Sequence, residues 1–130
     1  MSPMTDSNHE LAPDVFSSLC SSRGALQHLT GRWGSLTMAA LKMSTEPMRF
    51  AEIRRKVDGI SDRMLSQTLS QLERDGMVSR TVHSTIPPHV DYSLTALGQK
   101  LATPLVQLIS TVEQELEQVL QAQKEFDKQQ

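Results

Sequence analysis

Cysteine and aromatic residues are scarce in this sequence of 130 residues, and long apolar runs are missing. The single cysteine, Cys20, cannot form a disulfide within the chain, which excludes a disulfide-stabilised scaffold and favours a reducing compartment, the cytoplasm. With five aromatic residues, the core has to be filled mainly by aliphatic side chains and methionine. No stretch approaches the roughly 18 consecutive apolar residues of a membrane span, so we expect no membrane partner.

Positive charge is not in excess either, because the net charge is −2. This total argues against nucleic acid as a partner, but the distribution of charge changes the interpretation. Residues 20–95 carry ten basic and seven acidic side chains. Residues 1–19 have three acidic side chains and no Lys or Arg, and residues 96–130 have three lysines and five acidic side chains. The basic middle predicts moderate, salt-sensitive contact with phosphates.

Signatures of catalysis are also missing. The sequence has no phosphate-binding loop, no cofactor fingerprint and no nucleophile–base pair at a recognisable spacing. His28 and Ser35 lie near each other in sequence, but two such residues do not make a catalytic triad. We therefore expect neither an enzyme nor a bound cofactor.

The sequence does contain an ordered set of elements between residues 48 and 98. A short helix pattern leads through a tight turn at Gly59 into a second helix, which ends at Gly76 and is followed by two alternating, strand-like runs. Expected helices cover residues 22–29, 33–42, 50–57 and 62–75, and expected strands cover residues 77–83 and 90–94, with a tip at residues 86–89. Ser21 or Ser22 is the expected cap of the first helix. This order predicts a mainly α fold with a small β-wing, a winged helix-turn-helix.

The helix expected at residues 62–75 has a leucine stripe on one side and Arg, Ser and Gln on the other. Arginine can pair with guanine and glutamine with adenine, while serine bonds to phosphates or base edges. We expect Arg63, Ser66 and Gln67, in the first two turns, to reach base edges. Gln71 and Arg74 would then lie nearer the DNA backbone. The alternative is that this face is simply the solvated side of a surface helix.

The expected DNA contacts extend from this helix to the turn and the wing. They are Arg49, Ser61, Arg63, Ser66, Gln67, Gln71, Arg74, Arg80, His83 and His89. The wing residues Arg80, His83 and His89 would meet the backbone or the minor groove. His83 and His89, with Asp91 nearby, also have the donor types of a metal site. No Cys or third His joins them at ligand spacing, so we expect no metal there.

The C-terminal part carries a long apolar stripe at helical spacing, with Pro104 as an expected kink. One small domain cannot cover such a stripe, so we predict a homodimer. The expected organisation is a flexible N-terminal arm at residues 1–15, a winged helix-turn-helix DNA-binding domain at residues 16–95, and a dimerisation helix with a polar tail at residues 96–130.

Cys20 is expected at or just before the N-terminus of the first helix, with Arg23 one turn further on. Both features would favour the thiolate and hence reaction with an electrophile or oxidant. The products open to a lone thiol are a sulfenic acid, an adduct, or a disulfide to a partner subunit. The alternative is a buried, inert thiol that packs as a small hydrophobe.

The sequence resembles the HxlR-type transcriptional regulators, a winged helix-turn-helix family of bacteria and archaea. The resemblance covers about residues 20–108. It is most specific in the run Leu-Glu-Arg-Asp-Gly at residues 72–76 and in Tyr-Ser-Leu-Thr at residues 92–95. Other matching residues are Cys20, Gly31, Arg32, Trp33, Arg49, Phe50, Ile53, Arg54, Gly59, Ile60, Ser61, Met64, Leu65, Leu69, Met77, Val78, Arg80, Pro87 and Gly98.

This resemblance implies a dimer on a palindromic operator, with the helix at residues 62–75 in the major groove and the terminal helices at the dimer interface. Several family members sense quinones, aldehydes or oxidants through a cysteine near the start of the first helix, where Cys20 stands. Ser21 replaces the proline that frequently follows. We therefore expect a sequence-specific regulator of double-stranded DNA that responds to thiol-reactive or oxidising signals. The alternative is a winged-helix module for protein interaction without specific DNA binding.

Overall fold

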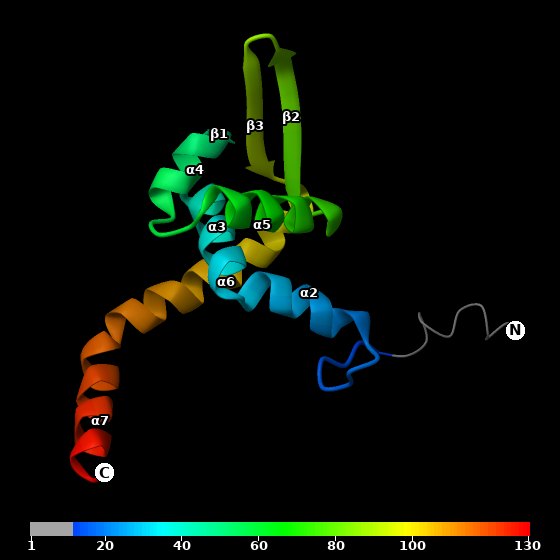
Figure 1. Ribbon diagram of the computed structural model, residues 1–130. Helices are drawn as coiled ribbons and strands as arrows, with labels where there is room; N and C mark the ends of the chain where they lie inside the picture. Colours follow the sequence, from blue (N-terminus) through cyan, green and yellow to red (C-terminus); the bar gives the residue numbers. More distant parts are fainter. Residues whose placement is uncertain (1–11) are drawn as a thin grey trace, which may run out of the picture.

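Helices and one small antiparallel sheet make up the described part of the chain, residues 12–130 of the computed structural model (Figure 1). The helices are α2 (Ser21–Thr30), α3 (Arg32–Met43), α4 (Phe50–Lys56), α5 (Asp62–Arg74), α6 (Ala96–Gln114) and α7 (Leu116–Lys128). The strands are β1 (Met48–Arg49), β2 (Val78–Thr85) and β3 (Pro88–Leu94). This order confirms the mainly α, winged helix-turn-helix fold. Most of the arm expected at residues 1–15 lies outside the described residues.

The core lies where α3 packs against α5, α6 and the sheet. Met38 of α3, Ile53 of α4 and Leu65 of α5 are fully buried in it. Trp33 and Tyr92 are only partly buried at its edge. The prediction that aliphatic side chains and methionine fill the core is confirmed, and the scarce aromatic residues cover its margin.

A close contact at Gly34 fixes the corner between α2 and α3. A Cβ at this position would lie 1.8 Å from the carbonyl oxygen of His28, so only a residue without a side chain fits. Gly31 ends α2 and is also the N-cap of α3, which leaves no room for a loop between the helices. The corner is therefore rigid.

The helix-turn-helix consists of α4, a tight turn and α5. Gly59 has a φ of +92°, a left-handed conformation that glycine adopts without strain. Ser61 is the N-cap of α5, and Gly76, with a φ of +78°, follows the end of this helix. Across the turn, Arg54 Nη1 donates to Asp62 Oδ1 at 2.8 Å. Glycine geometry and this ion pair together set the angle at which α5 leaves the turn.

The sheet has the strand order β1-β3-β2, with both pairs antiparallel. β1 is a strand that the sequence pattern did not predict, because two residues are too short to show alternation. Both wing strands are longer than predicted, and residues 88 and 89, expected in the tip, belong to β3. Proline is tolerated as the first residue of a strand, which explains why Pro88 can start β3. The wing therefore projects from the fold as a long ribbon (Figure 1).

The predicted C-terminal helix breaks at Glu115 and not at Pro104. Ala102 and Leu105, on either side of the proline, are buried against the core, and this packing outweighs the hydrogen bond that proline removes. All residues of α7 are exposed, and Figure 1 shows this helix leading away from the rest of the fold. None of the helices in residues 12–130 has the length and apolarity that a membrane crossing demands.

Candidate nucleic-acid interface

The polar side of α5 is exposed along its whole length. Arg63, Ser66, Gln67, Gln71 and Arg74 all lie on the surface, while the leucines of the opposite side are buried. Burial of that stripe fixes the rotation of the helix about its axis. The structure thus brings all five predicted side chains onto one accessible face, next to the base of the wing (Figure 1).

Ser61 has a structural contact as well as an exposed position. Its Oγ accepts a hydrogen bond from the N–H of Met64 at 3.0 Å and so caps the first turn of α5. The hydroxyl hydrogen is not used by this bond and can still donate to a phosphate oxygen. The residue lies at the positive end of the helix dipole, which favours an anion.

Three consecutive basic residues close α4, just before the turn. All three are exposed, and Arg54 is also paired with Asp62. Arg55 was not among the predicted contacts, although the run of basic residues was visible in the sequence. It lines an open groove of about 590 Å³ between α4 and β3, together with Arg49. The basic surface therefore extends further along α4 than the sequence pattern predicted.

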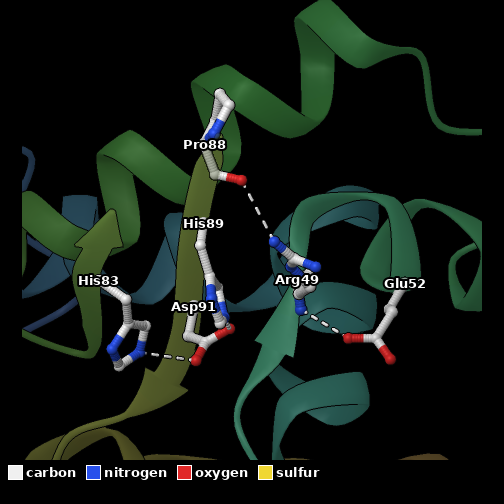
Figure 2. Close-up of polar contacts among 6 residues, drawn as sticks. All are labelled: Arg49, Glu52, His83, Pro88, His89 and Asp91. Carbon is white, nitrogen blue, oxygen red and sulfur yellow. Dashed lines mark hydrogen bonds and ion pairs between the residues drawn. The ribbon is translucent and has the colours of Figure 1, made fainter. Parts of the chain in front are cut away.

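Arg49 joins the short strand β1 to the wing. Its backbone N–H donates to Glu52 Oε1 at 2.8 Å, and its Nη2 donates to the carbonyl oxygen of Pro88 at 3.2 Å (Figure 2). Part of the guanidinium is thus used to hold β3. The remaining N–H groups stay available, because the side chain is exposed. Arg49 combines a positioning role with a free charge at the edge of the surface.

The wing places Arg80 and His83 on β2 and His89 on β3. Arg80 and His83 are exposed and His89 is half-buried. His83 and His89 were predicted as DNA contacts without a bound metal, and the structure brings both onto Asp91 (Figure 2). Their Nε2 atoms lie 2.8 Å and 3.4 Å from its carboxylate oxygens. The wing tip therefore carries a connected cluster and not two independent side chains.

Cys20 precedes α2 and is its N-cap, so the expectation that Ser21 or Ser22 caps this helix is wrong. The helix begins one residue earlier than predicted, and the Cys20 backbone is extended at that point. Ser22 forms a hydrogen bond with the cysteine, because its Oγ lies 3.0 Å from Cys20 Sγ. The N–H of Asp14 also donates to Sγ, at 3.4 Å.

These hydrogen bonds lower the pKa of the half-buried Cys20 thiol. The hydrogen bond with Ser22 is the main reason why the pKa of Cys20 lies below its ordinary value of 9.0, and the backbone N–H groups of Asp14 and Ser22 add to the effect. Arg23, the expected cause, does not contribute. The start of α2 lies far from the wing (Figure 1), so any effect of this thiol on the polar face of α5 has to pass through the fold.

Apolar side chains remain uncovered on the C-terminal helices. They include Leu108, Val112, Leu116, Val119, Leu120 and Phe126, each at least 43% exposed. Beside the first of them, a groove of about 250 Å³ runs between α6 and the α2–α3 corner and is lined by Thr30, Ser35 and Ile109 among others. An exposed apolar surface of this extent marks an interaction site.

Three comparisons with known proteins fit this geometry. The model of the HxlR-like helix-turn-helix family matches residues 28–120. The chain is 41% identical, over 112 residues, to YtfH, an uncharacterized HTH-type transcriptional regulator of Escherichia coli, with 86% of this chain and 87% of that protein covered. A solved structure of YtfH from Salmonella typhimurium is 42% identical, has a TM-score of 0.80, and covers 88% of this chain and 99% of that one.

A further solved structure concerns thiol chemistry. The redox regulator HypR in its oxidized form is 34% identical to this chain, with a TM-score of 0.65, and the match covers 73% of this chain and 96% of HypR.

Proposed function

Since this chain belongs to the HxlR-like helix-turn-helix family of transcriptional regulators, we propose that it binds a palindromic operator in double-stranded DNA as a homodimer. The observation that carries the proposal is the accessible polar face of α5 beside a projecting wing. A helix that lies in the major groove presents the donors and acceptors of one exposed face to base edges. We propose no catalytic activity for this protein. We also propose that it works in the cytoplasm, because its proposed ligand is chromosomal DNA.

The residues divide into two roles by their place on the surface. Arg63, Ser66 and Gln67, in the first two turns of α5, have the donors and acceptors that distinguish guanine and adenine. Gln71 and Arg74 lie one to two turns later and would follow the backbone. A separate group would contact phosphates from the turn and the wing, where it contributes affinity more than specificity. It comprises Arg49, Ser61, Arg80, His83 and His89.

Dimerisation through α6 and α7 explains the uncovered apolar side chains. A second copy of the chain would remove Val112, Leu116 and Leu120 from water at the same time as it pairs two recognition helices. Two-fold symmetry of the protein then requires two-fold symmetry in the operator, with half-sites about one turn of DNA apart. The dimer also doubles the modest positive charge available for phosphates.

Control by oxidants or electrophiles through Cys20 is the second part of the proposal. Its support is the thiol hydrogen bond to Ser22, the lowered pKa, and the likeness to a redox regulator. With diamide as oxidant, two Cys20 thiols of a dimer would lose two protons and two electrons, form one S–S bond, and reduce the azo group to a hydrazine. Such a bond would shift the relative position of the two α2 helices and so disfavour the spacing that the operator requires.

In vitro selection tests this function and identifies the operator in the same experiment. Reduced, full-length protein would be used to capture duplexes from a random library, and the captured DNA would be sequenced over several rounds. We expect enrichment of an inverted repeat with half-site centres roughly 10 base pairs apart. A library that stays random at low salt would contradict specific DNA binding and favour the protein-interaction alternative.

A further inference from the structure

Three metal-ligating side chains converge near the tip of the wing. His83 comes from β2, and His89 and Asp91 come from β3 (Figure 2). One ligand atom from each residue can be chosen so that all three lie within 4.8 Å of one another. The two imidazole rings are 4.7 Å apart, centroid to centroid, and tilted by 47°. Both strands of the ribbon thus contribute to one cluster.

An irregularity in the strand pairing lies next to this cluster. Thr81 pairs with Asp91 and Val82 with Val90, but the register then shifts, and Ser84 is the residue that pairs with His89. His83 is left outside the ladder. An extra residue of this kind bends the strand and redirects its side chain. An unbroken ladder would have placed His83 opposite His89, whereas here its Nε2 lies 2.8 Å from Asp91 Oδ2.

The carboxylate of Asp91 is shared between the two histidines. Its Oδ2 lies 2.8 Å from His83 Nε2, and its Oδ1 lies 3.4 Å from His89 Nε2. Arg49, the β1 neighbour of Asp91, turns its Nη2 to the carbonyl oxygen of Pro88. Nη2 of Arg49 is thus used for this contact, and the carboxylate of Asp91 contacts the two imidazoles.

The donor set suits a transition-metal ion. Two neutral imidazoles and one carboxylate are ligands of Zn²⁺, with Zn–N and Zn–O bonds of about 2.0–2.2 Å. Tetrahedral bonds of that length hold donor atoms roughly 3.3 Å apart, which these side chains reach by small rotations. The side chains of His83 and His89 are 47% and 44% exposed, so an ion has direct access from solvent.

Although the ligand spacing in the sequence led us to expect no metal here, we propose from this geometry that His83, His89 and Asp91 form a binding site for one divalent transition-metal ion, with Zn²⁺ as the best-suited occupant. The ion links β2 to β3 close to the tip and fixes the ribbon at its bulge. Three protein ligands leave at least one coordination position, which water or another oxygen donor fills. This site goes beyond DNA binding and exists in the free protein, so its test needs no operator.

Calorimetric titration of chelator-treated, full-length protein with ZnCl₂ tests the site. The titration is made in a Cys20→Ser background, because a thiolate elsewhere in the chain would compete for the ion. We expect one ion per chain with a dissociation constant in the micromolar range or below. His83→Ala and His89→Ala should each weaken binding at least tenfold, and Asp91→Asn, which keeps the shape and removes the charge, should weaken it as well.

Ser84→Ala is the matched control in the same part of the wing. It removes the hydrogen bond from Ser84 Oγ to the carbonyl oxygen of Pro87 but no metal donor, so zinc affinity should stay within about twofold of the parent. Circular dichroism checks that each variant is folded, and the exposed position of His83 makes unfolding of its variant unexpected. Absence of zinc binding at about 100 µM free zinc, or binding unchanged by His83→Ala and His89→Ala, would overturn the proposal.

Discussion

Ser61 Oγ accepts a hydrogen bond from the backbone N–H of Met64 at 3.0 Å. This contact lies where the turn ends and α5 begins. The bond satisfies one of the N–H groups that the first turn of a helix leaves without a partner. Through it, the orientation of the proposed recognition helix depends on a residue that itself faces the DNA side.

Loss of this cap should lower stability. Ser61→Ala is expected to reduce the free energy of unfolding by about 1 kcal/mol, while Ser61→Asp, which retains an acceptor, should recover most of the loss. Urea denaturation followed by circular dichroism measures both. Ser70→Ala, on an exposed position of the same helix, serves as control and should change stability little. Equal effects at Ser61 and Ser70 would mean that the cap contributes nothing.

Gly34 should not tolerate a side chain. Because a Cβ would lie 1.8 Å from the carbonyl oxygen of His28, Gly34→Ala has to displace α3 from α2 and should cost about 1–3 kcal/mol of unfolding free energy. Gly24→Ala is the matched control, since a Cβ at that helical position meets nothing within 4 Å. It should stabilise the protein by roughly 0.5–1 kcal/mol. Thermal unfolding of the two variants compares them, and a neutral Gly34→Ala would show that the corner is not tight.

Arg63 and Arg80 should differ in the kind of DNA affinity they provide. Arg63→Ala should cost about 1–3 kcal/mol on the operator and relax preference at one base pair of each half-site. Arg80→Ala should weaken binding to all sequences alike and lower the salt slope by about 1 for each chain that loses its phosphate contact. Fluorescence anisotropy over a range of salt concentrations separates the two. Lys124→Ala serves as control. It removes one positive charge from α7, away from the proposed DNA-binding surface of α5 and the wing, and should have no effect on DNA affinity.

The reactivity of Cys20 should follow its lowered pKa. The rate of alkylation by iodoacetamide should rise with pH through a midpoint below 9.0, because the thiolate forms at a lower pH in the folded protein than in an unfolded chain. Ser22→Ala removes the main cause of the shift, so the midpoint should move upward.

Cys20→Ser should make DNA binding insensitive to diamide. If the Cys20→Ser protein still loses DNA in diamide, the thiol is not the trigger.

The apolar surface of the C-terminal helices should hold the dimer together. Val112→Glu or Leu116→Glu places a charge where the proposed interface buries an apolar side chain, and should shift the protein to monomers. Both positions are exposed in the protomer, so its fold should persist. Sedimentation velocity measures the shift, with Gln118→Glu on α7 as control. A wild-type protein that sediments as a monomer at micromolar concentration would contradict the dimer.

The parts of the fold that sequence alone predicted are those with local causes. Gly59, Ser61 and Gly76 set the turn and both ends of α5 through backbone geometry and capping, which depend on neighbouring residues. The leucine stripe of α5 then determined which side is buried. These features made the candidate face of α5 predictable residue by residue.

The parts that sequence did not reveal depend on contacts between distant residues. β1 exists because Met48 and Arg49 pair with Tyr92 and Asp91, more than 40 positions away, and no pattern in two residues announces such a pairing. α6 continues through Pro104, and the neighbouring side chains of Ala102 and Leu105 are buried against the core. Likewise, the cluster at Asp91 depends on the pairing of β2 with β3, which brings His83 next to residues six and eight positions further along the chain.

The most direct test of the central claim is an anisotropy titration of the wild-type protein with the selected operator and with the same duplex after both half-sites are scrambled. Near physiological salt, specific binding of this kind exceeds non-specific binding by about 10³-fold or more. We predict that ratio for the reduced protein. Equal affinities for the two duplexes would contradict sequence-specific recognition by α5.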